Sequence, residues 1–474
     1  MNVLFCSGEA YPFSKTGGLA DVAFSLPKAL NQLGHNVKII TPLYQKIPSK
    51  PKDLLHIGQA MIHMGNFVIE ADFYETVFQG VTFIFVKNES FFNREMLYGY
   101  EDDANRFTFF NFAIFEYIKL TGNYPDVIHT NDWQTGMIPF FLDTRYRQVN
   151  AQFARIKTLL SIHNLEKQGS YPIETEKLFG NKNFTYIHMN RVNFLKCGIM
   201  RAHAINTVSN NYKNEILTKF YGFSLDGPLK SRQSDLYGIL NGLDQDLYNP
   251  KHNQFLYEDY DEFSQVEGKA KNKKHLLEFL KLDIKQDVPI IAFINRFASQ
   301  KGIDLIMQSL ETFLEEKKFY FIVIGSGDSL YEMFFSDMQK KYPTHVYFHQ
   351  GFDYELSQKV YGGSDIFLLP SLFEPCGLNQ MIAMRYGTLP IVRNTGGLKD
   401  TVRAYEPETN MGTGFSFENY DANELKTTID QALDLYNHHK PVWNELIVQA
   451  MQVRHSIVKM ARQYEELYIL ITNE

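Results

Sequence analysis

The sequence contains only three cysteines, and they lie far apart. Cys6, Cys197 and Cys376 are an odd set without paired spacing, so the sequence predicts neither a disulfide framework nor a zinc site. Isolated thiols are typical of a reducing compartment, and we expect the protein to work in the cytoplasm. The first six residues indicate a short strand and lack the charged and then apolar layout of a signal peptide.

Two further absences exclude membranes and nucleic acids as expected partners. No stretch approaches the roughly 18 apolar residues that a membrane span needs. The net charge is −7, and the 47 lysines and arginines are scattered without forming a basic stripe. Nucleic-acid binding depends on such a stripe, so the sequence offers no electrostatic basis for it. Any recognition of phosphate must therefore depend on a few local side chains.

What the sequence does contain is a repeated alternation of short apolar strands and helical stretches. Its 474 residues exceed what one hydrophobic core usually serves, so we predict two domains, residues 1–243 and residues 244–452. The alternation is typical of βαβ units and predicts an α/β fold with a Rossmann-like sheet in each domain. The expected strands are 3–6, 37–41, 127–129, 158–162 and 205–208 in the first half and 289–294, 320–324, 346–348, 366–369 and 390–392 in the second.

Two segments depart from this alternation. Residues 67–73, 76–78 and 81–86 alternate with turn residues, which predicts an antiparallel hairpin added to the first sheet. Residues 244–287 carry many charges and no strand pattern, so we expect a connection between the domains followed by a polar helix. Within it, Asp259-Tyr260-Asp261 has the spacing of a metal-binding triplet, but its charged surroundings favour a solvated surface.

The most informative motif is the run of residues 370–380. Residues 366–369 indicate a buried strand, and the apolar positions in 378–382 repeat at helical spacing. Glu374 and the amides near Gly377 therefore lie at the carboxyl end of a strand, where ligands of open α/β sheets bind. Amides at a helix N-terminus favour phosphate, so this turn can hold a sugar and an anion together. The alternative is an ordinary tight turn with a solvated glutamate.

Two long motifs resemble those of a known family. Residues 374–378, Glu-Pro-Cys-Gly-Leu, with residues 395–398, Thr-Gly-Gly-Leu, resemble the signature of bacterial glycogen synthases and plant starch synthases. Residues 15–22, Lys-Thr-Gly-Gly-Leu-Ala-Asp-Val, resemble the N-terminal motif of the same family. Two long motifs in the right order are far more specific than a lone glycine pattern. The resemblance extends to residues 98–107, 132–134, 162–164, 241–242 and 296–302, and so covers nearly the whole chain.

The resemblance implies a fold and a reaction. Members of the family have two Rossmann-like domains that face each other across a cleft, the GT-B arrangement, and their final helix crosses back to the first domain. We therefore expect residues 453–474 to pack on the first domain. The implied reaction transfers glucose from ADP-glucose to the non-reducing end of an α-1,4-glucan such as glycogen, with retention of configuration. ADP-glucose is a co-substrate in this reaction, and we expect no cofactor and no metal.

The reaction requires positive charge near the leaving group, because an anomeric C–O bond breaks while negative charge builds on two phosphates. Arg296 and Lys301 follow the strand 290–295 and match the Arg and Lys that clamp the diphosphate in the family. Lys15 is implied to reach the same phosphates from the first domain, which would couple closure of the cleft to catalysis. Glu374 matches the sugar-binding carboxylate of the family, and whether it also acts as a nucleophile stays open.

Two residues of the first domain complete the implied catalytic set. His163 follows the strand 158–162 and resembles the histidine that lies beside the glucose and stabilises the reacting ring through hydrogen bonding. Asp132 also follows a strand and matches an acid near the cleft, whose task does not follow from the sequence.

The remaining implied site residues surround these groups. Tyr354 is implied to stack on the nucleotide base, with core packing as the alternative. Asp21 is implied to lie near the donor, with capping of a helix as the alternative. The implied nucleotide-sugar site contains Lys15, Gly17, Gly18, Asp21, Gly325, Gly327, Tyr354, Cys376, Gly377, Leu378, Thr395 and Gly396. The implied acceptor side contains Asn164 and Asn241.

The sequence departs from the family pattern at three places. Leu372 stands where the family has Arg, and Glu166-Lys167 replaces Ala-Tyr; both changes bear on acceptor or interface details. Arg454-His455-Ser456 lacks the aromatic signature of the last helix, which bears on domain docking.

Two other functions stay open. One is another retaining glucosyltransferase of the same fold, specific for UDP-glucose or an oligosaccharide. The other is a catalytically silent glucan-binding partner, although the retained lysines, arginine, histidine and glutamate argue against it. The oligomeric state does not follow from the sequence.

Overall fold

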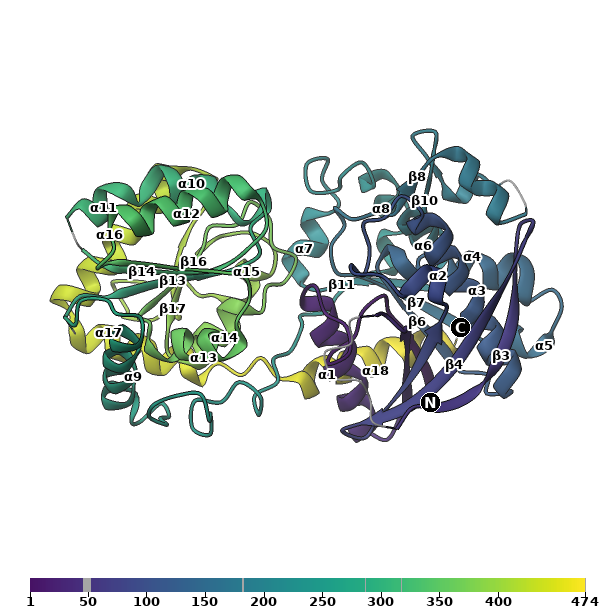
Figure 1. Ribbon diagram of the computed structural model, residues 1–474, viewed down its shortest axis with the longest axis horizontal. Coiled ribbons are helices and arrows are strands. Elements are labelled where there is room, and N and C mark those ends of the chain that lie inside the picture. The colour runs from purple at the N-terminus through teal and green to yellow at the C-terminus, as the bar shows by residue number, and fades with distance from the viewer. Residues whose placement is uncertain (46–52, 181–182, 286, 317, 474) are drawn as a thin grey trace. The chain divides into compact units, whose positions relative to one another are not determined.

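The computed structural model describes residues 1–45, 53–180, 183–285, 287–316 and 318–473. The chain divides into two units (Figure 1). The first unit contains Met1–Gly242 and Ile457–Glu474, and the second contains Leu243–Ser456. Each unit is built around a sheet of mainly parallel strands, so the predicted α/β fold class is confirmed. None of the helices in these described residues has the length and apolar character needed to cross a membrane.

The sheet of the first unit has nine strands within the described residues. Across the sheet their order is β12 (Leu236–Gly238), β11 (Ala204–Thr207), β7 (Lys157–Ile162), β6 (Val127–Asn131), β1 (Asn2–Cys6), β2 (Asn36–Pro42), β5 (Val81–Lys87), β4 (Phe67–Phe78) and β3 (Leu55–Met64). The strands from β12 to β5 run parallel, and β4 and β3 are added antiparallel at one edge. All strands predicted for the first half of the chain are present.

The antiparallel hairpin at this edge is more extensive than the sequence predicts. β4 is one continuous strand, because Glu75 and Thr76 stay in register with β5. β3 is not predicted, since its sequence has few of the β-branched and aromatic residues that mark strands. Pairing with β4 along its length stabilises β3 as a strand, although its own residues have little preference for strand structure. A separate small antiparallel sheet contains β8 (Ser170–Tyr171), β10 (Arg191–Asn193) and β9 (Ile187–His188).

Helices and helical turns cover both faces of the large sheet. The α-helices of this unit are α1 (Gly18–Gln32), α2 (Glu89–Phe92), α3 (Asp103–Thr121), α4 (Ile138–Phe141), α5 (Ala151–Ala154), α6 (Phe194–Arg201), α7 (Asn210–Glu215), α8 (Asp226–Ser231) and α18 (Ile457–Asn473). Shorter helical turns are η1 (Trp133–Thr135), η2 (Leu142–Tyr146), η3 (Ile173–Leu178), η4 (Phe184–Tyr186) and η5 (Gln233–Asp235).

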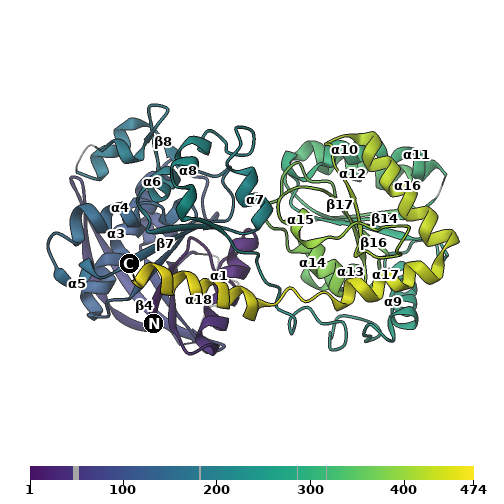
Figure 2. The same ribbon diagram turned by 180° about the vertical axis from the view of Figure 1, so that it is seen from behind.

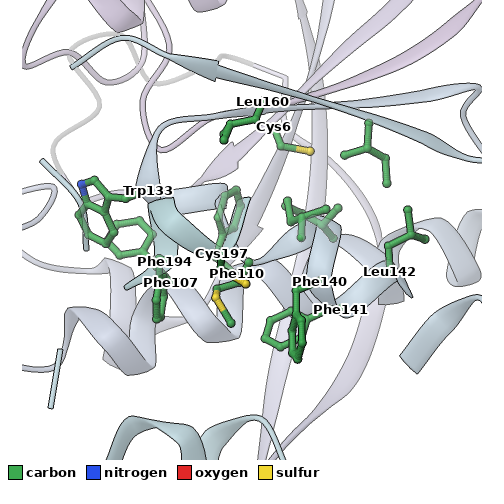
Figure 3. Close-up of a cluster of buried hydrophobic side chains, with 14 of the residues drawn as sticks. Cys6, Phe107, Phe110, Trp133, Phe140, Phe141, Leu142, Leu160, Phe194 and Cys197 are labelled. Atoms are coloured by element: carbon green, nitrogen blue, oxygen red, sulfur yellow. The ribbon is translucent and has the colours of Figure 1, made fainter. Parts of the chain in front are cut away.

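Alternate residues of the central strands pack into two different cores. Cys6 of β1 belongs to the core that α3 and α6 close, and Figure 3 shows it above Phe107, Phe110 and other aromatic rings. Its neighbour Phe5 belongs to the core that α1 and α18 close on the other face. This alternation follows from the two-residue period of a strand.

The C-terminal helix α18 packs along α1, and both views show the two side by side (Figure 1, Figure 2). The hydroxyl oxygen of its Tyr468 lies 2.7 Å from His129 Nδ1, and Asn206 Nδ2 donates to the hydroxyl oxygen of Tyr464 at 2.8 Å. Ser161 Oγ joins these pairs, 2.6 Å from His129 Nε2 and 2.6 Å from Asn206 Oδ1. A buried polar network of this kind, with its members paired, favours one position of the helix on the sheet.

The second unit contains a parallel sheet of six strands within its described residues. Their order is β15 (Val346–Gln350), β14 (Tyr320–Gly325), β13 (Ile290–Ile294), β16 (Ile366–Leu369), β17 (Leu389–Arg393) and β18 (Phe415–Phe417). The helices are α9 (Gln265–Phe279), α10 (Ile303–Ser309), α11 (Glu311–Glu315), α12 (Ser329–Lys341), α13 (Tyr354–Gly363), α14 (Asn379–Arg385), α15 (Gly396–Thr401), α16 (Ala422–His438) and α17 (Lys440–Gln452), with the turn η6 (Ser299–Lys301). In both views α10 and α12 cover one side of the sheet, and α13 and α14 cover the other (Figure 1, Figure 2).

The segment 244–287, which the sequence predicts as a charged connection, belongs to the second unit. It contains the expected polar helix, α9, but Lys273 of this helix is buried and donates to Asp365 Oδ2 at 2.7 Å. The prediction of a solvated surface for the Asp-Tyr-Asp triplet is wrong at its centre, because the Tyr260 ring is buried against Gly268 of α9. The absence of a side chain at Gly268 makes the space that the ring fills.

Candidate functional site

Several predicted donor residues lie at the ends of strands in the second unit or in the segments that follow them. Arg296 comes after β13, Gly325 ends β14, Glu374 comes after β16, and Thr395 comes after β17. These strands are parallel neighbours, so their carboxyl ends meet at one edge of the sheet. We call this the strand-end edge. In open α/β sheets it is the edge at which ligands bind.

Lys301 and Glu374 form an ion pair at the strand-end edge. Lys301 Nζ donates to Glu374 Oε2 at 2.6 Å, and Ser371 Oγ donates to the same oxygen at 3.3 Å. The two side chains of the pair are only 14% and 10% exposed. The pair therefore places a cation that can meet an anion beside a carboxylate that can accept from sugar hydroxyls.

The turn after Glu374 is held in a shape that requires glycine. Gly377 has φ = 75°, in the left-handed region. The Gln380 side chain folds under the turn and donates to the carbonyl oxygens of Cys376 and Gly377, both at 3.0 Å. The carbonyl of Glu374 accepts from the backbone N–H of Gly397 at 2.9 Å, which ties the turn to the loop after β17. The structure thus brings together the predicted residues Glu374, Cys376, Gly377, Leu378, Thr395 and Gly396.

Arg296 and the glycine turn after β14 lie on the same edge. Gly325 and Gly327 pack so closely against the backbone of Asn295 and Phe297 that a Cβ at either glycine would overlap a carbonyl oxygen. The Arg296 side chain is exposed. A guanidinium on a rigid, closely packed turn is well placed to contact an anionic ligand.

Tyr354 is half-buried at the start of α13, and its ring lies edge-on to Phe255 with centroids 5.7 Å apart. This contact agrees with the packing role that the sequence left open. Stacking on a nucleotide base stays a prediction.

The first unit carries the predicted Lys15 loop between β1 and α1. Lys15 Nζ donates to both carboxylate oxygens of Asp21, at 2.7 and 2.8 Å. Burial raises the pKa of Asp21, and the charge of Lys15 opposes this rise. Gly17 precedes α1 and Gly18 begins it, so the four predicted residues of this loop lie together. Asp21 here pairs with the lysine, and the N-cap of α1 is Gly17 without a side-chain capping bond, so a contact of Asp21 with the donor stays a prediction.

Asp132, His163 and Asn164 form a second group in the first unit. Asp132 has φ = 53°, and its Oδ1 accepts from the backbone N–H groups of His163 and Asn164 at 2.7 and 3.4 Å. His163 Nε2 lies 2.9 Å from Asn131 Oδ1. The Asn131 amide nitrogen donates to the carbonyl of Cys6, so its oxygen is an acceptor and His163 Nε2 carries the proton. His163 Nδ1 is then the nitrogen that can accept.

Burial favours the neutral forms of both titratable groups. Burial raises the pKa of Asp132 to about 7, although two backbone N–H groups stabilise its carboxylate. Burial lowers the pKa of His163 to about 3, so the imidazole is neutral near pH 7. A neutral imidazole can accept from a sugar hydroxyl through Nδ1 without adding positive charge.

We expect Asp132→Asn to remove a pH-dependent loss of stability. An unfolded aspartate has a pKa of about 3.9, and the folded value is about 7, so the native state binds the extra proton between these values. The stability linked to that proton is complete below about pH 4 and is lost as the pH rises through about 7. Asparagine keeps the acceptor oxygen and cannot ionise, so the variant should avoid a loss on the order of 4 kcal/mol.

The measurement is the difference in unfolding free energy between variant and wild type from about pH 5 to about pH 8. This difference should grow in favour of the variant up to about pH 7 and then stay constant. Asp337→Asn on α12, where the side chain is 73% exposed, is the matched control and should follow the wild type. A difference that does not vary with pH would contradict a pKa of Asp132 that burial raises in the folded protein.

The two predicted acceptor-side residues have different surroundings. Asn164 Oδ1 accepts from the backbone of Glu166 at 3.0 Å, within the Asp132 group. Asn241 lies after β12 and is buried, and its Oδ1 has no hydrogen-bond partner among the described residues. The structure therefore connects Asn164 to the predicted site and leaves the role of Asn241 a prediction.

The three departures from the family pattern occupy defined places. The carbonyl of Leu372 accepts from the Arg393 guanidinium, which helps to hold the backbone of this turn. Glu166 and Lys167 pair with each other at 3.1 Å on the surface. Arg454 pairs with an acidic side chain of its own unit at 3.5 Å.

Three neighbours of the predicted residues are not singled out by the sequence. Glu9 contacts the Lys15 loop, Asn131 contacts His163, and Ser371 contacts Glu374. Asn131 and Ser371 lie within the strand-end motifs, and this position is the only signal that could have identified them. In the described ranges no group of three or more His, Cys, Asp or Glu side chains is arranged to hold a metal ion. The absence of a metal from the reaction stays a prediction.

Comparisons with known proteins match both units. Residues 2–231 match the family described as "Starch synthase catalytic domain", and residues 277–443 match "Glycosyl transferases group 1". The chain is 48% identical to a glycogen synthase of Acholeplasma laidlawii, with 100% of both proteins covered, and 43% identical to one of Bacillus cereus, with 99% of each covered. A solved structure of the catalytic domain of starch synthase IV from Arabidopsis thaliana, bound to ADP and acarbose, matches with a TM-score of 0.93 and 30% identity, covering 100% of this chain and 99% of that one.

Proposed function

The chain belongs to the glycogen synthase family, and from this premise we propose that it transfers glucose from ADP-glucose to the non-reducing end of an α-1,4-glucan with retention of configuration. Identity at this level over the full length of both proteins is the first support. The observation that carries the chemistry is the Lys301–Glu374 pair, which joins a cation and a sugar-binding carboxylate at the strand-end edge.

In the proposed reaction, the bond between the anomeric carbon and the diphosphate oxygen breaks. The 4-hydroxyl oxygen of the acceptor forms the new bond to that carbon, and the hydroxyl proton leaves with the diphosphate. Arg296 and Lys301 offset the negative charge that develops on the leaving group, so they act most strongly in the transition state. This assignment needs no metal ion, because the two side chains supply the positive charge.

Glu374 is proposed to bind the glucose rather than to attack it. Its Oε2 is engaged by Lys301 and Ser371, and Oε1 is the oxygen that faces substrate hydroxyls in this proposal. A carboxylate held by a lysine is a weaker nucleophile than one without a cationic partner. This supports a front-face reaction in which the departing phosphate receives the acceptor proton.

In the first unit, His163 is proposed to accept a hydrogen bond from a glucose hydroxyl through Nδ1. Its lowered pKa keeps the imidazole neutral for this role. Asp132 is proposed to hold the backbone of His163 in place. Lys15 and the glycines after it are proposed to contact the nucleotide sugar. The three cysteines are free thiols, which supports the expectation that the protein works in the cytoplasm.

Donor and acceptor can be tested together. The protein is incubated with glycogen and either ADP-glucose or UDP-glucose, and nucleotide release and glucan length are measured. We expect ADP-glucose to be the better donor, with activity unchanged in the presence of a metal chelator. Faster reaction with UDP-glucose would support another transferase of the same fold. Binding of glycogen without nucleotide release from either donor would support a silent glucan-binding partner.

A further inference from the structure

Glu9 is a buried carboxylate that the proposed chemistry does not use. It follows β1, and the residue is only 2% exposed. Its Oε2 accepts two hydrogen bonds from Thr16, one from the backbone N–H and one from the hydroxyl, both at 2.7 Å. Thr16 stands between Lys15 and Gly17, so both bonds reach the centre of the Lys15 loop.

The directions of these hydrogen bonds form a chain. The Thr16 hydroxyl donates its only proton to Glu9, so its oxygen is the acceptor toward the Tyr98 hydroxyl, with which it also makes a short contact. Tyr98 therefore donates to Thr16, and Thr16 donates to Glu9. The Glu9 carboxylate is therefore bonded directly to the backbone of the loop and, through the Thr16 hydroxyl, to the Tyr98 side chain of a distant segment.

The charge of Glu9 depends on this loop for its stabilisation. Burial raises the pKa of Glu9 to about 7, while the two Thr16 bonds act in the opposite direction. Asp21 raises it further and Lys15 lowers it, and these two groups belong to the same loop and the start of α1. The buried Asp132, which follows β6, also interacts with Glu9 as a like charge. A carboxylate that is removed from water and bonded by two loop donors has little freedom to move, and neither has the loop.

We propose that Glu9 is a positioning residue that holds the Lys15 loop in its donor-binding conformation through Thr16. This inference rests on the proposed function, because the loop is the part of the first unit that is assigned to the nucleotide sugar. Glu9 acts through the loop in this proposal and does not touch the donor. The alternative is that Glu9 binds substrate directly through its second oxygen, which lies near Gly17.

A double-mutant cycle between Glu9 and Lys15 separates these roles. Glu9→Gln keeps the shape but removes the charge, so the bonds to Thr16 weaken and kcat/KM for ADP-glucose should fall about 10-fold. Lys15→Ala removes the side chain that the loop presents. If Glu9 acts through this loop, the double variant should be no worse than Lys15→Ala alone. Losses that multiply in the double variant would show that Glu9 acts independently, and would contradict the proposal.

Thr16 supplies a second, independent test. Thr16→Val removes the hydroxyl bond to Glu9 and keeps the shape and the backbone bond, so kcat/KM for ADP-glucose should fall as it does in Glu9→Gln. This variant can be measured even if Glu9→Gln does not fold. Thr16→Ser keeps the hydroxyl and should restore activity close to that of the wild type. Equal activity of the valine and serine variants would contradict the proposal.

Hydrogen exchange supplies a readout that does not depend on activity. The Thr16 amide should exchange about 10-fold faster in Glu9→Gln than in the wild type, because its acceptor is weaker. Unchanged exchange would contradict the positioning role while leaving the proposed function intact. A wild-type protein that transfers no glucose from ADP-glucose would instead contradict the proposed function, and with it the role of the loop in donor binding.

Discussion

Arg296→Ala should lower kcat by about 10²-fold or more while KM for ADP-glucose changes much less. The guanidinium is proposed to act on charge that develops only as the diphosphate leaves, so its removal affects the transition state more than the bound donor. Its side chain is exposed, and the free energy of unfolding should change by no more than about 0.5 kcal/mol. Steady-state kinetics and denaturant unfolding of the same preparation measure both quantities.

Lys301→Ala should lower kcat by a similar factor of about 10². It should also reduce stability, by up to about 3 kcal/mol, because it leaves the mostly buried Glu374 without its cation. Lys359→Ala is a matched control, since Lys359 is 12% exposed and pairs with Glu355 at 2.6 Å but lies on α13. The control should retain full turnover. An unchanged kcat in Arg296→Ala or Lys301→Ala would contradict the assignment of that residue to the leaving group.

Glu374→Gln should reduce kcat by about 10²-fold with the fold retained. The amide replaces one acceptor with a donor and removes the charge that pairs with Lys301, so both sugar binding and the orientation of the lysine are affected. The measurement is kcat for ADP-glucose with glycogen as acceptor, alongside a thermal unfolding curve that reports the fold.

Glu355→Gln is the control for this variant, because it breaks a lysine–glutamate pair of the same unit that is not among the predicted site residues. Its turnover should equal that of the wild type. Normal turnover in Glu374→Gln would mean that Glu374 only stabilises the turn before α14, as the alternative interpretation of the sequence holds.

The parts of the fold that could be predicted are those with a strong local pattern. Central strands such as β13 and β16 are buried on both faces, so their apolar runs identify them. β3 could not be predicted, because pairing with β4 determines its structure and its own residues do not favour a strand. The burial of Lys273 and Tyr260 could not be predicted for a related reason. Their hydrogen-bond partners, Asp365 and the carbonyl of Tyr386, lie far away in the sequence.

The candidate site shows the same division. Glu374 and Lys301 could be predicted as site residues because each follows a strand end within a specific motif. Their direct ion pair could not, because it joins positions that only the parallel sheet brings together. Glu9 gave no signal, since a single glutamate after a strand is common and its role depends on a hydrogen bond to Thr16.

The most direct test of the central claim is the identity of the newly formed bond. The protein is incubated with glycogen and ADP-glucose labelled with carbon-13 in the glucose, and the product is examined by NMR. We predict labelled glucose in α-1,4 linkage at the non-reducing ends, formed by the wild type and reduced about 10²-fold in rate in Arg296→Ala. Labelled glucose in β linkage, or released without attachment to the glucan, would contradict a retaining α-1,4-glucan glucosyltransferase.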